Sequence, residues 1–97
     1  MRIIARKTLR VYWEKHKDAG QPLLAWYKIA KNAKWKNFNE MKASIKSASI
    51  VGNERVVFNI KGNDYRLVVK IDFSWQVIFI RFIGTHKEYN EIDAQNI

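Results

Sequence analysis

Residues 55–84 read RVVFNIKGNDYRLVVKIDFSWQVIFIRFIG, and this stretch decides the fold. Three runs rich in Val, Ile and Phe alternate with polar side chains, as expected of strands whose two faces differ. Two turn signals, Lys61-Gly62-Asn63-Asp64 and Ser74-Trp75, separate the runs. The stretch therefore predicts three antiparallel strands joined by consecutive hairpins.

The two turns also predict which residues face each other across the hairpins. A two-residue loop at Gly62-Asn63 sets the first register, and a loop at Ser74-Trp75 sets the second. This register gives every side chain of the three strands a defined face. The predicted partners are Arg55 with Lys70, Val57 with Val68, Asn59 with Arg66, Val68 with Arg81, and Arg66 with Ile83.

One face of the predicted sheet is wholly apolar, and the other is basic. The apolar face carries Val56, Phe58, Ile60, Tyr65, Leu67, Val69, Ile71, Ile78, Ile80 and Phe82. The basic face carries Arg55, Asn59, Lys61, Arg66, Lys70 and Arg81 among Val57, Val68, Val77, Phe79 and Ile83. An ordinary solvated face of an antiparallel sheet is one explanation of this second pattern. The alternative is a partly covered groove that binds an anion, because a guanidinium among apolar side chains is costly to desolvate without one.

The first half of the chain is predicted to supply the helices that cover the apolar face. A short strand is expected at 2–5 and helices at 6–18, 22–35 and 39–47, with Asn39 as the N-cap of the last. The aromatic residues Trp13, Trp26 and Trp35 are assigned to the core. The predicted fold class is α+β, with an N-terminal strand and helices packed on one face of an antiparallel sheet and a short C-terminal helix.

The composition limits the class of protein. A chain of 97 residues with 47% apolar side chains supports one domain over residues 1–97, with a single modest core. No apolar run is long enough to span a membrane and no signal peptide opens the chain, so we expect a cytoplasmic protein without a membrane partner. Cysteine is absent and the two histidines are far apart, so we expect no metal site.

The positive charge is concentrated in the first half. Residues 1–50 hold twelve basic and three acidic side chains, a net charge of +9, whereas residues 51–97 hold six of each. A field of this sign favours nucleic acid, an acidic protein or an anionic membrane surface as a partner. No helix-turn-helix signature appears, so a basic DNA-binding domain is a weak alternative.

A histidine stands where the last strand passes into a helix. Thr85-His86-Lys87-Glu88 fits a capping box, which explains Thr85 and Glu88 as structural residues. The same geometry places His86 and Lys87 beside the free amides of a helix start, which is a favourable site for an anion. His86 could exchange protons with a bound substrate there, and the alternative that it only holds the helix end stays open.

These groups suit RNA cleavage without a metal. The attacking 2′-hydroxyl needs a base, the leaving 5′-oxygen needs a proton, and the phosphorane between them needs positive charge. Arginine serves the last role best because its planar fork matches phosphate oxygens. The same groups also suit binding without cleavage.

Two motifs carry a resemblance to a known family. Phe-Asn-x-x-Gly-Asn-x-Tyr-Arg spans residues 58–66, and Gly-Thr-His-x-Glu-Tyr spans residues 84–89. Together with Trp26-Tyr27, Trp35 and Ala48-Ser49, they make nearly the whole chain resemble the HigB-type toxins of the RelE/ParE-like superfamily.

The resemblance implies a toxin of a type II toxin–antitoxin system that cleaves mRNA on translating ribosomes and needs no cofactor. It implies mRNA, ribosomal RNA and a HigA-type helix-turn-helix antitoxin as partners, with operator DNA bound only through the antitoxin complex. Superfamily members differ in target, so two alternatives stay open: a non-catalytic toxin such as a gyrase inhibitor, and an RNA-binding module. The charge of residues 1–50 would then form a salt-sensitive surface for ribosomal RNA.

The family pattern also implies roles for individual residues. Arg66 and Arg81 are expected to contact the phosphate and the transition state, His86 to transfer a proton, and Tyr89 to position substrate or aid proton transfer. Asn90 stands where the family more often has aspartate, which puts an acidic role there in doubt. The expected RNA-binding residues are Asn59, Lys61, Arg55, Lys70 and Lys87.

Overall fold

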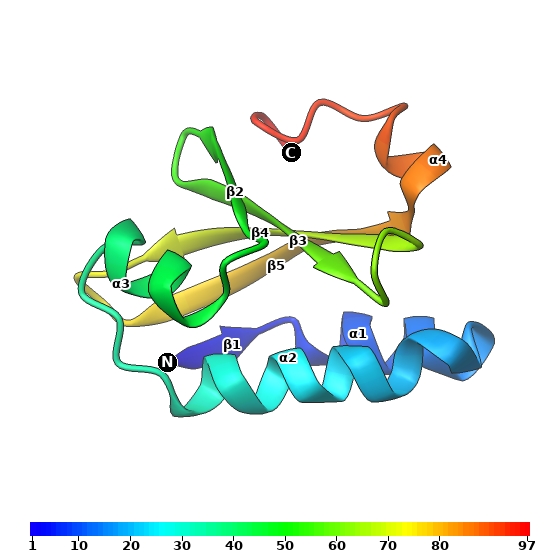
Figure 1. The fold of residues 1–97 in the computed structure, drawn as a ribbon, viewed down its shortest axis with the longest axis horizontal. Coiled ribbons are helices and arrows are strands. Elements are labelled where there is room, and N and C mark those ends of the chain that lie inside the picture. Colours follow the sequence, from blue (N-terminus) through cyan, green and yellow to red (C-terminus); the bar gives the residue numbers. More distant parts are fainter.

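A five-stranded sheet forms the centre of the computed structural model, which describes residues 1–97 (Figure 1). The strand order is β1-β5-β4-β3-β2, and every neighbouring pair is antiparallel except β1 and β5. The α+β prediction is confirmed, and the strand expected at 2–5 is β1, whereas β2 was not predicted. The strands are β1 (Arg2–Ile4), β2 (Ser49–Gly52), β3 (Arg55–Ile60), β4 (Tyr65–Asp72) and β5 (Val77–Thr85).

The first hairpin has the predicted register. Arg55 pairs with Lys70, Val57 with Val68, and Asn59 with Arg66. In the turn, Lys61 and Gly62 have the positive φ angles of 52° and 64°, and the amide of Asp64 donates to the Lys61 carbonyl at 3.2 Å. Glycine adopts that left-handed conformation without steric cost, so Gly62 marks the turn in the sequence.

The second hairpin departs from the prediction at a β-bulge. From Asp72–Val77 to Val69–Ile80 the register is the one set by the Ser74-Trp75 loop, but the register then shifts between Val68 and Val69. The extra residue is Arg81, so the predicted pairs Val68–Arg81 and Arg66–Ile83 are wrong. Beyond the bulge Val68 pairs with Phe82, and Arg66 pairs with Gly84.

The bulge also exchanges the faces of the residues that follow it, because side chains alternate along a strand. Ile83 packs against the main core, although it was assigned to the basic face. Phe82 packs with Val57 and Val68 on the opposite face, although it was assigned to the core face. Both assignments failed because they assumed an unbroken ladder.

The helices lie close to the predicted segments but differ at their ends. The first helix stops at Lys15 and a short 3-10 turn, η1, follows, since His16 leaves the helical conformation with a φ of −125°. The third helix is capped by Asn37, whose side chain accepts from the Glu40 amide at 2.9 Å, and the prediction of Asn39 was wrong. The elements are α1 (Arg6–Lys15), η1 (Lys17–Ala19), α2 (Gly20–Asn32), α3 (Phe38–Ser44) and α4 (His86–Tyr89).

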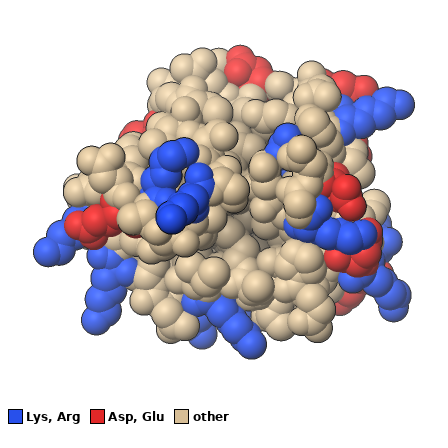
Figure 2. Space-filling model, viewed as in Figure 1, with Lys and Arg blue, Asp and Glu red and all other residues tan.

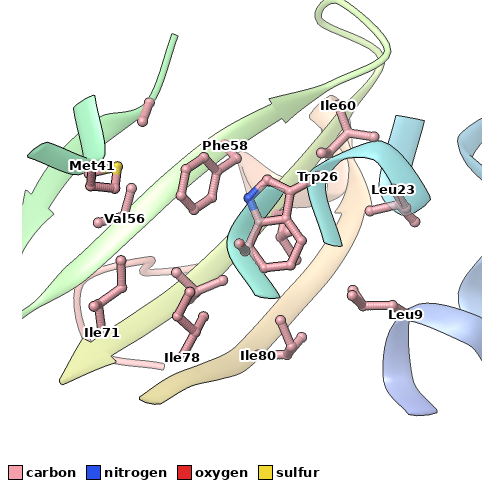
Figure 3. Packing of buried hydrophobic residues seen from close by; sticks show 14 of the residues in the cluster. Leu9, Leu23, Trp26, Met41, Val56, Phe58, Ile60, Ile71, Ile78 and Ile80 are labelled. Atoms are coloured by element: carbon pink, nitrogen blue, oxygen red, sulfur yellow. The ribbon is translucent and has the colours of Figure 1, made fainter. Parts of the chain in front are cut away.

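The main core lies between the helices and one face of the sheet (Figure 3). Leu9 of α1 and Leu23 of α2 are fully buried there, and Trp26 lies beside Phe58 with ring centroids 5.4 Å apart. Trp26 and Trp35 are buried as predicted, and Trp13 is half-buried against the same cluster. No helix of the structure has the length and apolar character needed to cross a membrane.

The C-terminal segment covers the second face of the sheet. It follows α4 and runs back over the side opposite α1 and α2 (Figure 1). Ala94 is buried against Val57 and Val68, with Ile92 and Ile97 packed around it. The valines of this face are therefore partly covered, as predicted, and residues 92–97 of the chain provide the cover.

Candidate active site

Four predicted site residues meet at one end of the basic face. Arg66 of β4 donates from Nη1 to Oδ1 of Asn59 on β3, and its Nη2 lies 3.4 Å from Nε2 of His86 on α4. The guanidinium carbon of Arg66 is 5.7 Å from the centre of the Tyr89 ring. Arg66 thus contacts all three of the others, and we call these four residues the Arg66 cluster.

The register of the sheet brings the cluster together. Asn59 stands opposite Arg66 because of the Gly62 turn, and the bulge at Arg81 sets Gly84 opposite Arg66 on the other side. The chain then enters α4, so His86 begins a helix directly beside the guanidinium. Without the bulge, the start of α4 would be one residue further along the ladder.

The start of α4 is fixed by the predicted capping box. The Glu88 amide donates to Oγ1 of Thr85 at 3.1 Å, and the Thr85 amide donates to Oε1 of Glu88 at 2.8 Å. A side chain at Gly84 would be crowded, because a Cβ there would lie 2.5 Å from Cζ of Phe82 and 3.0 Å from Oε1 of Glu88, so these side chains would have to shift. Thr85 and Glu88 are therefore structural, as expected, and they hold His86 in place.

Two of the helix-start amides expected beside His86 already have acceptors. The His86 amide donates to the carbonyl of Asp64 at 3.1 Å, and the Glu88 amide is used by Thr85. The β3–β4 turn and the cap therefore supply acceptors for two of the amides from which an anion site was expected.

The contact between Arg66 and His86 has one protonation requirement. A guanidinium has donors only, so the contact is a hydrogen bond when Nε2 of His86 carries no proton. His86 and Asn59 therefore both offer acceptor atoms to the same guanidinium. An incoming phosphate can replace either acceptor, and Nε2 is then free to take a proton.

Arg55 and Arg81 lie in a different group. Arg55 donates to the carbonyl oxygen of Ile97 from Nε at 3.1 Å and from Nη2 at 2.6 Å, and Arg81 donates to the same oxygen at 3.2 Å. Arg81 is exposed at the bulge. The structure therefore joins Arg81 to Arg55 and the C-terminal segment, whereas its predicted partners were Arg66 and His86.

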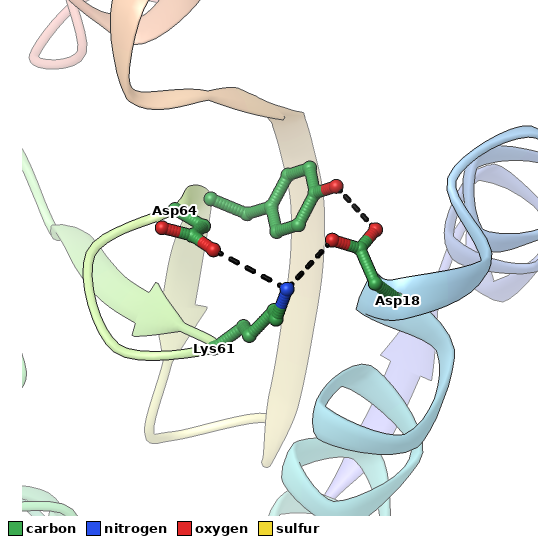
Figure 4. Close-up of polar contacts among 4 residues, drawn as sticks. Asp18, Lys61 and Asp64 are labelled. Atoms are coloured by element: carbon green, nitrogen blue, oxygen red, sulfur yellow. Dashed lines mark hydrogen bonds and ion pairs between the residues drawn. The ribbon is translucent and has the colours of Figure 1, made fainter.

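Lys61 is held at the hairpin tip by two carboxylates (Figure 4). Its Nζ lies 2.8 Å from Asp18 of η1 and 3.4 Å from Asp64, and the Tyr65 hydroxyl donates to Asp18 at 2.5 Å. The hydrogen bond from Lys61, followed by that from Tyr65, lowers the pKa of Asp18 below its usual value. The same contacts raise the pKa of Lys61 and of Tyr65.

Comparison with known proteins shows the family of the chain. The family model described as HigB toxin, RelE-like toxic component of a toxin–antitoxin system, matches residues 19–92. The chain belongs to the HigB toxin family. It is 30% identical over 96 residues to the mRNA interferase toxin HigB of Escherichia coli strain K12, which covers 97% of this chain and 92% of that protein. The same identity and coverage hold for the mRNA interferase HigB proteins of Escherichia coli O157:H7 and Shigella flexneri.

The remaining cations of this HigB family toxin are not neutralised by acidic neighbours. Apart from Lys61, no lysine or arginine has a side-chain carboxylate of Asp or Glu within 4.0 Å, and many of these side chains project from the surface (Figure 2). Lys87 is exposed beside His86, and Lys70 is half-buried on the basic face. No group of three or more His, Cys, Asp or Glu side chains is arranged to hold a metal ion.

Sequence reasoning missed the residues that tie this site to the helical half of the toxin. Asp18 links η1 to Lys61 and Tyr65, and the turn that contains them accepts the amide of His86. One signal was present: Asp18 is among only three acidic residues in the first half of the chain. The sequence carries no signal for the role of Asp64, because its contact with His86 is made by the backbone carbonyl, which every residue type has.

Proposed function

We propose that this HigB family toxin is an mRNA interferase, an endoribonuclease that cuts messages on translating ribosomes in the cytoplasm. The observation that carries the proposal is the Arg66 cluster, which sets a guanidinium against an imidazole nitrogen and a phenol at one site. The relatives from Escherichia coli and Shigella flexneri bear the name mRNA interferase, and the family is a toxic component of toxin–antitoxin systems.

The proposed reaction is an internal displacement at phosphorus. The 2′-oxygen forms a bond to the adjacent phosphorus, and the bond from phosphorus to the 5′-oxygen breaks, which leaves a 2′,3′-cyclic phosphate and a 5′-hydroxyl. Nε2 of His86 takes the 2′-proton, and the Tyr89 hydroxyl provides the proton for the leaving oxygen. Arg66 binds the phosphate oxygens and stabilises their charge in the transition state. Asn59 orients Arg66 through the contact with Oδ1.

The ribosome and the antitoxin complete the proposal. The net charge of +9 on residues 1–50 suits docking on ribosomal RNA, with an affinity that falls as salt rises. The cognate antitoxin neutralises the toxin, and operator DNA is reached only through that complex. Arg55, Lys70 and Lys87 extend the positive surface along the bound message, and Arg81 does so where the C-terminal segment leaves it open.

The test is a reconstituted translation reaction in which the 5′ ends of the message are mapped with and without ribosomes. Ribosome-dependent cuts are expected with the toxin, and His86→Ala and Arg66→Ala should each remove most of them. Intact message in both reactions would leave binding without cleavage, as in a gyrase inhibitor or an RNA-binding module. Unchanged cutting by both variants would place the chemistry on another face of the molecule.

A further inference from the structure

The outer edge of β5 is only partly paired. β1 pairs with β5 at Val77, Ile78 and Phe79 and then ends at Ile4, whereas β5 continues to Thr85. The chain leaves the sheet at Ala5, whose left-handed conformation with a φ of 72° turns it into α1. Past Phe79, β5 therefore has β4 on one side and no strand on the other. Such an edge presents unpaired N–H and C=O groups that can accept another strand.

A groove of about 560 Å³ runs along this open edge. Phe82 and Ile83 both line the groove, and adjacent residues of a strand point to opposite faces. A hollow that reaches both must therefore lie at the side of β5, and α1 forms its other wall. The lining residues are Lys7, Thr8, Val11, Tyr12, Lys15, Phe82 and Ile83.

The chemistry of the groove defines its occupant. Val11 is 42% exposed, and Lys7 and Lys15 stand one helical turn before and after it. Neither lysine has a carboxylate within 4.0 Å. The unpaired backbone groups of β5 can pair with a polypeptide in extended form. The apolar lining of the groove would bind an aliphatic or aromatic side chain of that polypeptide, and the two lysines would pair with acidic residues on either side of it. Nucleic acid would use the lysines but would leave the strand edge and the apolar floor without complements.

We propose that the groove between α1 and the open edge of β5 is a docking site for an extended acidic segment of the antitoxin. The segment adds a strand beside residues 80–85, in line with the end of β1, and sets an apolar side chain against Val11 and Phe82. Its carboxylates pair with Lys7 and Lys15. The inference rests on membership of the toxin family and is independent of the proposed cleavage chemistry.

The location explains how such a segment could control the site. β5 passes from Ile83 to His86 within three residues, and the strand edge and the start of α4 are one continuous piece of chain. A strand added beside residues 80–85 would place protein next to the Arg66 cluster without occupying the guanidinium itself. Neutralisation could then follow from blocked access to the ribosome.

Hydrogen–deuterium exchange tests the docking mode. The probe is the cognate antitoxin, co-expressed and purified with the full chain. We expect the amides of residues 80–85 and the exposed face of α1 to exchange at least about tenfold more slowly in the complex than in the free toxin. Protection confined to the basic face, or none at residues 80–85, would overturn the proposal. Neither message nor ribosome is present, so failure here is separable from failure of the cleavage proposal.

Matched variants test the chemistry of the groove. Val11→Glu should weaken antitoxin binding about tenfold or more, while Ile29→Glu should not, because Ile29 is 48% exposed on α2 and lies outside the groove. Replacing Lys7 and Lys15 with Glu should weaken binding more than the same exchange at Lys28 and Lys31, which controls for net charge. Equal losses in both pairs would indicate a diffuse electrostatic contact and would reject the groove. Binding by a second copy of the toxin, seen as Val11-dependent dimers in sedimentation, would also reject it.

Discussion

Arg66 owes its position to contacts on three sides. Asn59 and His86 offer acceptor atoms to its two terminal nitrogens, and the ring of Tyr89 faces its carbon. The planar guanidinium meets the two acceptors from two separate nitrogens in a fixed geometry, whereas a lysine ammonium would present its three donors on a single nitrogen, as a point charge. The shape of the side chain, in addition to its charge, is therefore expected to matter for cleavage.

We predict that Arg66→Lys lowers ribosome-dependent cleavage at least about tenfold, because one of the two phosphate contacts is lost. Single-turnover cleavage with excess toxin measures the effect, and thermal unfolding checks that the variant folds. Arg10→Lys on α1 is the control for exchanging the two cations and should leave cleavage unchanged. A full rate in Arg66→Lys would reduce the role of Arg66 to charge alone.

The hydroxyl of Tyr12 is a buried polar atom without a hydrogen-bond partner. Its ring stacks on His16 with centroids 4.1 Å apart and meets Tyr65 edge-on at 5.8 Å. Burial, followed by the nearby carboxylate of Glu88, raises the pKa of Tyr12 to about 12, so the hydroxyl keeps its proton at neutral pH. The ring packs well, and the oxygen gains nothing from being buried.

Tyr12→Phe is therefore expected to raise the free energy of unfolding by up to about 1 kcal/mol, because it removes an unpaired donor and keeps the ring. Tyr65→Phe is the matched control and should lower stability, since the Tyr65 hydroxyl donates to Asp18. Urea denaturation measures both. A loss of stability in Tyr12→Phe would reveal a partner for the hydroxyl in solution.

At the scale of elements, the junction between β5 and α4 decides where His86 stands. The ring of Phe82 lies over Gly84, and the capping box starts at the next residue. Gly84→Ala should cost about 1–3 kcal/mol, because the new methyl group meets the Phe82 ring and the capping carboxylate. Gly20→Ala is the contrasting variant: the nearest atom is Cβ of Trp13 at 3.7 Å, so helix propensity should raise stability by up to about 1 kcal/mol.

Chemical denaturation separates these two glycine variants, and cleavage assays should show lower activity only for Gly84→Ala. If Gly84→Ala were as stable as the parent, the Phe82 ring would have an alternative rotamer, and the junction would be less rigid than described. Normal cleavage by a destabilised Gly84→Ala variant would mean that His86 keeps its place without the tight junction.

The same junction shows which elements could be predicted from the sequence. The β3–β4 register followed from the Gly62-Asn63 turn, because a two-residue loop at a known place fixes which residues face each other. The bulge could not be predicted, since Arg81 is neither glycine nor proline and its neighbours continue the alternation. Strand β2 was missed because Ser49–Gly52 is too short to show a period.

At the scale of the whole molecule, both faces of the sheet are covered, one of them only in part. The helices cover one side, and residues 92–97 cover part of the other, where Arg55 and Arg81 hold the Ile97 carbonyl. The sequence predicted a covered groove from the valines among the arginines, but the cover itself was not predictable. Ile92, Ala94 and Ile97 are too sparse to show any helical or strand period.

The helical half is tied to the site by the network of Asp18, Lys61 and Tyr65. Asp18 accepts from both of the other residues, and Lys61 and Tyr65 stand at either end of the turn whose Asp64 carbonyl accepts the His86 amide. The two hydrogen bonds lower the pKa of Asp18 below the ordinary value of 3.8. An acid whose pKa is lower in the folded state than in the unfolded state stabilises the folded state at any pH above the unfolded-state pKa. This stability is lost as the pH falls through the folded-state pKa.

Asp18→Asn should accordingly lower the urea midpoint by the same amount at about pH 7 and about pH 5, since Asp18 is ionised at both. The difference from the parent should shrink once the pH falls below 3.8 and should vanish below the lowered pKa of the folded state. Glu14→Gln on α1 is the control, because Glu14 has no cation within 4.0 Å. A difference that persisted unchanged in acid would assign the effect of Asp18→Asn to lost packing, and the link between η1 and the hairpin would then owe nothing to charge.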